Sequence, residues 1–240
     1  MKDKSSQSSL LPLITAVFVT ILVLTPSTSS KFITLGTIQL GSWHVGPLNV
    51  VGATLFFPIN YLFNDILTEV YGYERSRRII WIGLACQLFA AAMYALIQYW
   101  PAASFWHNEA AYDAILGQAP RIVAGSLCAY FVGEFVNSFV LSKLKYWANG
   151  GNVLRVAFRF VASTFVGEFF DSFIFLTISF YGQMANTVLI ETIITIWLLK
   201  ALYEVVALPV SLPLTAWIKR RESIDHIDHP EATNYSPFRL

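Results

Sequence analysis

The chain has 240 residues, of which 55% are hydrophobic and 13% are charged, and its formal net charge is +1. Soluble domains carry about 25% charged residues, so this composition excludes an ordinary water-soluble domain. With a mean hydropathy of +0.55, it favours the lipid bilayer as the surroundings of the chain. The near-neutral charge also excludes a strongly basic surface, so no nucleic-acid partner is expected.

Six apolar runs, separated by polar segments, follow one another along the chain. Each run holds the roughly 20 residues that a helix needs to cross a hydrocarbon core of about 30 Å. Helices are expected because lipid offers no hydrogen-bond partner to an unpaired backbone group. The pattern predicts an all-α membrane protein with six transmembrane helices, at residues 9–27, 48–68, 79–99, 121–142, 157–180 and 187–212.

The two ends of the chain and the first connection differ from these runs. Two early lysines, the apolar stretch 10–24 and the small residues after it are also the pattern of a cleavable signal peptide, whose removal would leave five spans. Residues 31–47 predict a short external hairpin or loop. We expect a transmembrane domain over residues 1–218 and a polar cytoplasmic tail over residues 219–240.

Lysine and arginine residues gather on one side of the predicted membrane. Lys31 and Arg121 lie on the other side, and Lys200 lies inside the last span. Cytoplasmic segments carry the excess of positive charge, so this distribution places both termini in the cytoplasm. The cytoplasmic set holds thirteen of the sixteen cations, namely Lys2, Lys4, Arg75, Arg77, Arg78, Lys143, Lys145, Arg155, Arg159, Lys219, Arg220, Arg221 and Arg239.

A nine-residue segment occurs twice, as FVGEFVNSF at 131–139 in the fourth predicted span and as FVGEFFDSF at 165–173 in the fifth. Consecutive spans run in opposite directions, so the two copies have opposite orientations. Transporters with inverted repeats place their binding groups near the midplane in this way. The alternative is a packing motif in which small residues such as Gly133 and Gly167 let two helices approach closely.

Several polar residues fall near the middle of the predicted spans, where an ionised side chain costs about 3 kcal/mol or more. Glu168 and Asp171 are three residues apart and share one helix face, and Glu134 and Asn137 have the same spacing. Lys200 is the counter-ion available to them. One lysine cannot neutralise three carboxylates, so at least one carboxyl is expected to be protonated in an empty site. The candidate substrate-binding residues are Glu134, Asn137, Glu168, Asp171 and Lys200.

Three further acids are candidate gating or coupling residues. Asp65 and Glu69 are four residues apart toward the cytoplasmic end of the second predicted span. Glu204 lies one turn beyond the lysine of the last span. We expect Asp65 and Glu69 to couple a cytoplasmic gate to the arginine-rich loop by pairing with Arg75 or Arg78.

The sequence contains no G-x-x-x-x-G-K-[ST] phosphate-binding motif, no H-E-x-x-H zinc motif and no G-x-S-x-G nucleophile motif. We therefore expect a protein that is not an enzyme and that binds no metal and no cofactor. Two alternatives stay open. One is an intramembrane hydrolase that uses Asp171 with another carboxyl as an acid/base pair. The other is a substrate-binding subunit of an ATPase-driven vitamin importer.

The segment FPINYLFNDILTEVYG at 57–72, followed by Arg75, Arg77, Arg78 and Trp81, resembles the signature of the queuosine precursor transporters. These are small, vitamin-uptake-like proteins of the bacterial inner membrane. The polar elements of the fourth and fifth spans and the lysine of the sixth also agree, so the resemblance covers about residues 45–215. One departure is that many members carry glutamine where this chain has Glu134 and Glu168.

The resemblance implies import of 7-cyano-7-deazaguanine or 7-aminomethyl-7-deazaguanine across the inner membrane. A guanine-like edge presents an N1–H and an exocyclic amine side by side, and a carboxylate can accept both hydrogen bonds. Lys200 would serve as counter-ion or as partner of the ligand's carbonyl oxygen. The sequence leaves open the energy source, the preferred deazaguanine, the retention of the first span and the oligomeric state, including a homo-oligomer.

Overall fold

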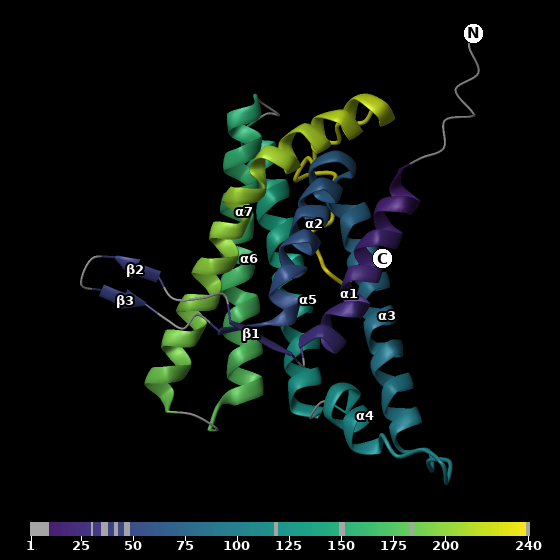
Figure 1. The fold of residues 1–240 in the computed structure, drawn as a ribbon. Coiled ribbons are helices and arrows are strands. Elements are labelled where there is room, and N and C mark those ends of the chain that lie inside the picture. Colours follow the sequence, from purple (N-terminus) through teal and green to yellow (C-terminus); the bar gives the residue numbers. More distant parts are fainter. Residues whose placement is uncertain are drawn as a thin grey trace.

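The computed structural model describes residues 10–29, 31–34, 38–40, 43–45, 49–117, 120–148, 152–182 and 185–238. Five of its helices are long and apolar enough to cross a membrane, so the chain is a multi-pass membrane protein. They are α1 (Leu11–Ser29), α3 (Tyr73–Gln98), α5 (Pro120–Trp147), α6 (Val153–Phe180) and α7 (Asn186–Glu222) (Figure 1). They confirm five of the six predicted spans.

The second predicted span, 48–68, is wrong in its bounds. Residues 49–51 form a strand and Gly52–Leu55 a 3-10 helix, and only then does α2 (Phe57–Tyr71) begin. Its 15 residues extend about 22 Å, which is less than the hydrocarbon core. The polar residues Asn60, Asn64 and Glu69 are buried, because α1, α3, α5 and α7 contact this helix. A sixth full-length span is therefore not confirmed.

Four short strands connect α1 to α2. β1 (Phe32–Thr34) pairs antiparallel with β4 (Asn49–Val51), and between them β2 (Ile38–Leu40) pairs antiparallel with β3 (Trp43–Val45). Figure 1 shows the β2–β3 hairpin projecting from the side of the helical bundle. A hairpin agrees with the prediction for residues 31–47. A short helix, α4 (Glu109–Leu116), follows α3 at the end of the bundle opposite the last turns of α7 (Figure 1).

The start of α1 and the end of α7 lie together at one end of the bundle. The backbone N–H of Leu10 donates to Glu222 at 2.6 Å, and the cations of the last α7 turn, Lys219 to Arg221, lie at this end. Pro209 and Pro213 interrupt the hydrogen bonds of α7, and Figure 1 shows that the last turns bend over the bundle. This placement puts both helix ends on the same side of the bundle, and their cytoplasmic location stays a prediction.

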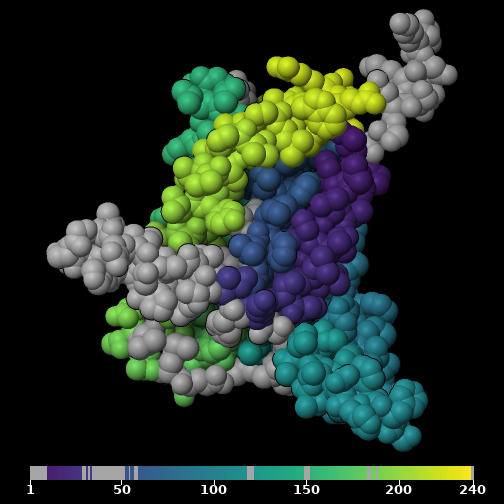
Figure 2. All heavy atoms as spheres, in the orientation of Figure 1, coloured from purple at the N-terminus to yellow at the C-terminus, as the bar shows by residue number. Residues whose placement is uncertain are grey.

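The apolar core joins α1, α2, α3 and α5. Phe18 and Leu22 of α1 are buried with Ile66 of α2, Ile80 of α3 and Tyr130 of α5 in one cluster. Figure 2 shows α1 lying along α2 on the face in view. Because α1 supplies three buried side chains, Ile14, Phe18 and Leu22, to the cluster, the structure favours retention of this helix over its removal as a signal peptide.

The repeated segment forms the crossing of α5 and α6. A Cβ added to Gly133 would lie 2.9 Å from the Cβ of Asp171, and one added to Gly167 would lie 2.8 Å from the Cβ of Asn137. The two glycines are equivalent positions of the repeat, as are Asn137 and Asp171. Each copy thus contacts the other through equivalent positions, because the glycine of one copy lies against the Asn137 or Asp171 position of the other. The small residues of the repeat serve close helix packing and leave its polar residues beside the crossing.

The Gly167→Ala variant should destabilise the protein by about 1–3 kcal/mol, because the added methyl group meets side-chain and backbone atoms of α5. Thermal unfolding in detergent, followed by the loss of monodisperse protein, measures the effect. Phe173→Leu is the matched control, because Phe173 belongs to the same repeat copy and is 47% exposed. Equal melting temperatures for Gly167→Ala and the unaltered protein would contradict the crossing.

Candidate functional site

The interior of the helical bundle contains two groups of charged side chains. We call Lys200, Glu168 and Asp171 the lysine cluster; it joins α6 and α7. We call Glu69, Lys145, Arg159, Lys219 and Asp225 the cytoplasmic ion network; it joins α2, α5, α6, α7 and the segment after α7. Lipid cannot solvate these charges, so their pairing is a condition for the fold.

In the lysine cluster one ammonium group serves two carboxylates. The Lys200 Nζ lies 2.6 Å from Oδ2 of Asp171 and 2.7 Å from Oε2 of Glu168. Glu168 is 1% exposed and Asp171 is 4% exposed. The two acids are one turn apart on α6 and present their oxygens to the same point. Lys200 is therefore paired with both acids of α6 in this structure.

Glu134, beside the lysine cluster, has unused hydrogen-bonding capacity. It lies on α5, is 1% exposed and interacts electrostatically with Asp171, Glu168 and Lys200. Its Oε1 accepts a hydrogen bond from Asn60 Nδ2 at 3.5 Å, and its Oε2 has no hydrogen-bond partner among the described residues. A buried carboxylate oxygen without a donor is costly, so a donor from a ligand or a proton would stabilise it.

The 131–139 copy of the repeat also contacts α2 through Asn137. Asn137 donates to Asp65 Oδ1 at 2.6 Å, and Thr164 donates to Asp65 Oδ2 at 3.3 Å. Asn137 thus meets an acid of α2, whereas its equivalent Asp171 meets the amine of α7. Glu204, one turn beyond Lys200, is 2% exposed, and its Oε1 has no hydrogen-bond partner among the described residues.

Polar side chains of α2 that the sequence analysis missed hold α3 and α5 in place. Ser76 donates to Asn64 Oδ1 at 2.8 Å, and Ser138 donates to the same oxygen at 3.0 Å. Thr68 donates to Ser138 at 3.2 Å. Asn60, Asn64 and Thr68 recur every four residues, so they form a polar stripe on one face of α2. That spacing is the signal that could have identified them.

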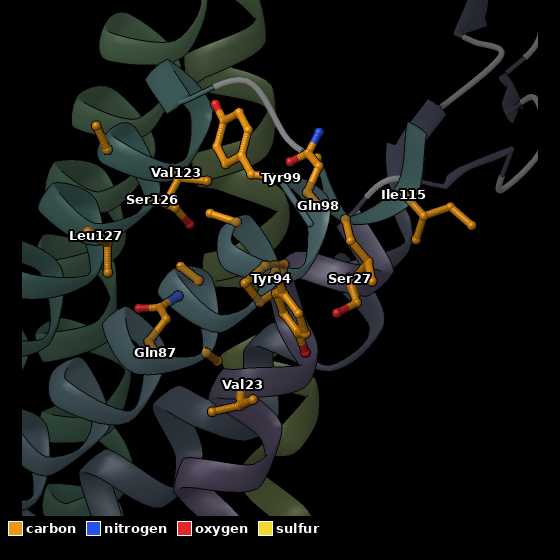
Figure 3. Close-up of a pocket in the computed structure, with 17 residues that line it drawn as sticks. Val23, Ser27, Gln87, Tyr94, Gln98, Tyr99, Ile115, Val123, Ser126 and Leu127 are labelled. Atoms are coloured by element: carbon orange, nitrogen blue, oxygen red, sulfur yellow. The ribbon is translucent and has the colours of Figure 1, made fainter. Parts of the chain in front are cut away.

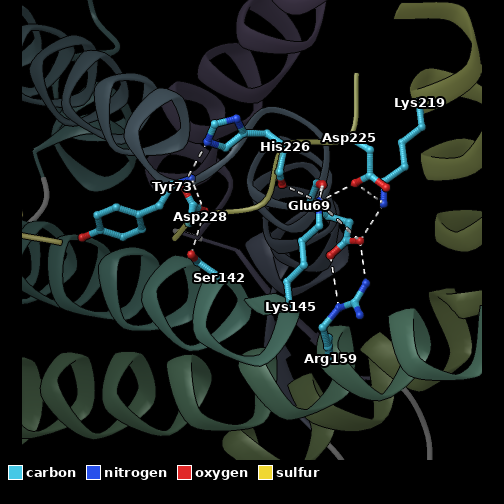
Figure 4. A network of polar contacts seen from close by, with 9 residues as sticks. All are labelled: Glu69, Tyr73, Ser142, Lys145, Arg159, Lys219, Asp225, His226 and Asp228. Carbon is cyan, nitrogen blue, oxygen red and sulfur yellow. Dashed lines mark hydrogen bonds and ion pairs between the residues drawn. The ribbon is translucent and has the colours of Figure 1, made fainter. Parts of the chain in front are cut away.

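Glu69 is the centre of the cytoplasmic ion network (Figure 4). Arg159 donates to it from Nη2 at 2.6 Å and from Nε at 3.2 Å, which is the strong two-bond arrangement of guanidinium and carboxylate. Lys219 binds the same carboxylate at 2.7 Å, and Lys145 donates to the backbone carbonyl of Glu69. Asp225 accepts from Lys145 at 2.5 Å and pairs with Lys219 at 2.9 Å.

The predicted partners of Glu69 are wrong. Arg75 and Arg78 belong to the first turns of α3 rather than to a loop, and both are exposed. The cations that bind Glu69 come instead from α5, α6 and α7. Their positions are 76, 90 and 150 residues away in the sequence, so no local spacing could have identified them.

Residues 223–238, which follow α7, fold back over the end of α2, the start of α3 and the end of α5. Asp228 is 1% exposed and accepts hydrogen bonds from the backbone of Tyr73 at 3.0 Å and from Ser142 at 2.7 Å (Figure 4). Arg77 donates to the carbonyls of Asn234 and Ser236 at 2.6 and 2.8 Å. The predicted polar tail is thus packed on the bundle, and α7 itself continues to Glu222.

Asp225 is the carboxylate through which this tail joins the network. Burial raises its pKa, but hydrogen bonds from Lys145 and Lys219 outweigh burial, so the pKa of Asp225 lies below its ordinary value of 3.8. Its contribution to stability is therefore complete above that ordinary value and is lost only as pH falls through the lowered pKa. The tail is expected to stay attached throughout the neutral and mildly acidic range.

Comparison with known proteins agrees with the resemblance seen in the sequence. The model of the family described as "Putative vitamin uptake transporter" matches residues 51–214. A "Probable queuosine precursor transporter" of Bacillus subtilis (strain 168) is 30% identical over 98 residues, which are 40% of this chain and 40% of that relative. The aligned region thus covers less than half of the relative's length. No solved structure matches the chain.

Asp228→Ala should release the tail, because a charge-assisted hydrogen bond contributes about 1.5–3 kcal/mol and Asp228 accepts one from Tyr73 and another from Ser142. Hydrogen–deuterium exchange of the peptide 223–238 should become at least tenfold faster. Glu231→Ala, an exposed acid of the same tail, should leave the exchange unchanged. Slow exchange in Asp228→Ala would show that other contacts hold the tail.

Proposed function

Because this chain belongs to the vitamin uptake transporter family, as do the queuosine precursor transporters that its sequence signature resembles, we propose that it imports a 7-deazaguanine precursor of queuosine. The cargo is 7-cyano-7-deazaguanine or 7-aminomethyl-7-deazaguanine, and the membrane is the bacterial inner membrane. The observation that carries the proposal is the buried, unsatisfied Oε2 of Glu134 beside the lysine cluster.

The chemistry of the site suits the edge of such a base. The N1–H and the exocyclic amine are two adjacent donors, and the carboxylate of Glu134 provides two acceptors for them. The carbonyl oxygen next to N1 needs a donor, which Lys200 supplies when it releases one of its two carboxylate partners. The bound base thus satisfies Glu134 and replaces one acid as a partner of Lys200. Asn137 and the acids of the lysine cluster complete the proposed substrate-binding set.

The crossing of α5 and α6 provides a pivot for alternating access. The two copies of the repeat contact each other through Gly133 and Gly167. Each glycine lies against the other copy, Gly133 against Asp171 and Gly167 against Asn137. In inverted-repeat transporters, one repeat moves against the other around a fixed site near the midplane. Glu134, Glu168 and Asp171 are at most 4% exposed, so the structure corresponds to a state in which the proposed site is occluded.

Asp65, Glu69 and Glu204 form the proposed gating and coupling set. Asp65 and Glu69 lie one turn apart on α2, and they face different partners: Asp65 binds Asn137 of the repeat, and Glu69 binds the cytoplasmic ion network. A shift of Asn137 on substrate binding would therefore move α2 and pull on the ion pairs that close the cytoplasmic end. Glu204, one turn beyond Lys200 on α7, would accept a hydrogen bond from the lysine or take up a proton during that change.

Glu134→Gln should reduce uptake of radiolabelled precursor at least tenfold, because an amide offers one acceptor oxygen where the carboxylate offers two. Uptake is measured in cells that cannot make the precursor, with membrane protein level and melting temperature measured in parallel. Glu191→Gln, an exposed acid of α7, is the matched control and should transport normally. Full uptake by Glu134→Gln would remove this residue from the site.

Lys200→Ala should also abolish uptake. The substitution leaves Glu168 and Asp171 buried without their counter-ion, which costs about 3–5 kcal/mol of stability. The amount of protein in the membrane is therefore measured in parallel with uptake.

Glu69→Gln should open the cytoplasmic end of the bundle, because it removes the charge that Arg159 and Lys219 share. Ser163, which is fully buried one turn beyond Arg159, is replaced by cysteine in a chain with Cys86→Ala and Cys128→Ala. A membrane-impermeant maleimide applied to inside-out vesicles should label this position at least fivefold faster in Glu69→Gln. Arg220→Gln, which removes an exposed charge nearby, should not change the rate. Equal rates in all three proteins would show that the ion network is not the gate.

A further inference from the structure

A hollow lies at the opposite end of the bundle from the ion network. It has a volume of about 380 Å³, and α1, α3, α4 and α5 line it (Figure 3). Its α3 residues run from Gln87 to Gln98, in the half of that helix away from the arginines of its first turns, and Tyr99 follows directly after the helix. We call it the outer pocket. Its volume falls in the range of small-molecule sites, and the lysine cluster contributes no residue to it.

The lining of the outer pocket is uncharged and contains small residues. Ala90, Ala91, Ala95 and Ala124 leave the space open, and aliphatic side chains complete the apolar wall. None of the lining residues is a carboxylate, lysine, arginine or histidine. A charged ligand would lose its hydration there without compensation, so the pocket suits a neutral molecule.

Gln87 gives the pocket a hydrogen-bond acceptor that favours a ligand with a donor group. It is 5% exposed, and its Oε1 has no hydrogen-bond partner among the described residues. Figure 3 shows Gln87, Ser126 and Tyr94 around the same hollow. An orphaned amide oxygen requires an N–H or O–H donor from whatever fills the space. A lipid chain has no such donor, whereas a neutral nitrogen heterocycle has both N–H groups and a flat face for Tyr94.

A line of residues along α5 connects the outer pocket to the lysine cluster. Ser126 lines the pocket, Tyr130 follows four residues later, and Glu134 follows four residues after that, so the three side chains share one helix face. Tyr130 is 3% exposed and donates to the carbonyl of Ile80 at 3.2 Å. The tyrosine thus lies along α5 between the pocket and Glu134, and its hydrogen bond ties it to α3.

We propose that the outer pocket is an entrance site that holds a neutral, flat N–H-donating heterocycle through Gln87 before it passes Tyr130 to reach Glu134. This inference rests on the proposed function, because the heterocycle is the transported base. It adds a second binding site in series with the first. The entrance site selects an uncharged molecule by shape and by one hydrogen bond, and the inner site then binds its donor edge with a carboxylate.

The test is protection of a cysteine in the pocket from labelling. Ser126→Cys is made in a chain with Cys86→Ala and Cys128→Ala, and right-side-out vesicles are treated with an impermeant maleimide. Added 7-cyano-7-deazaguanine or guanine, which are uncharged, should slow the labelling at least threefold, whereas 7-aminomethyl-7-deazaguanine, whose primary amine is protonated at neutral pH, should protect less. The same protection should persist in Glu134→Gln, which lacks the inner site. This arm separates the entrance site from the proposed function, because it needs no transport.

Two variants of the pocket provide the matched comparison. Ala91→Leu fills the hollow and Gln87→Leu removes its acceptor, so both should abolish protection and raise the KM for uptake at least fivefold without lowering the maximal rate. Ala92→Leu, an exposed neighbour outside the pocket, should change neither. The proposal is overturned if no heterocycle protects, if protection disappears in Glu134→Gln, or if only added phospholipid slows the labelling.

Discussion

The fold depends on the pairing of charges that lipid cannot solvate, and the bond between Lys200 and the two acids of α6 is the clearest case. Moving an ion out of water costs several kcal/mol even after relaxation, and the lysine cluster contains three buried or nearly buried ions. Their mutual contacts fix α7 against α6. Since α6 in turn crosses α5 at the two repeat glycines, the position of Lys200 also determines where Glu134 lies.

The short helix α2 connects the two charged regions. Its polar stripe binds α3 and α5, Asp65 binds the repeat, and Glu69 binds the cytoplasmic ion network. A helix with so many polar groups could not face lipid, and the surrounding helices α1, α3, α5 and α7 explain how it is tolerated. The same shielding makes α2 suitable for transmitting movement, because its polar residues have defined partners on α3, α5, α6 and α7.

Hydropathy alone predicted the five long helices, since each apolar run exceeds the length of a crossing. It failed for the second run because residues 49–55 are mostly apolar but form a strand and a 3-10 turn, while the polar stripe of α2 lies among apolar neighbours. The acids and Lys200 could be selected because charge at mid-membrane is rare. The partners of Glu69 could not, because they come from three other helices, and the tail carboxylate Asp228 gave no signal in a polar segment.

The absence of charge in the lining of the outer pocket and its abundance beside Glu134 set an order for the two sites. A base that leaves water first for an uncharged pocket exchanges its hydration for apolar contact and a hydrogen bond to Gln87. Only then does it meet a carboxylate, where each hydrogen bond is stronger because the surroundings exclude water. If the order were reversed, the strong site would hold the base at the outer end. In the proposed path, placing the weak site outside and the strong site at the crossing of α5 and α6 would couple tight binding to the helices that we propose to move.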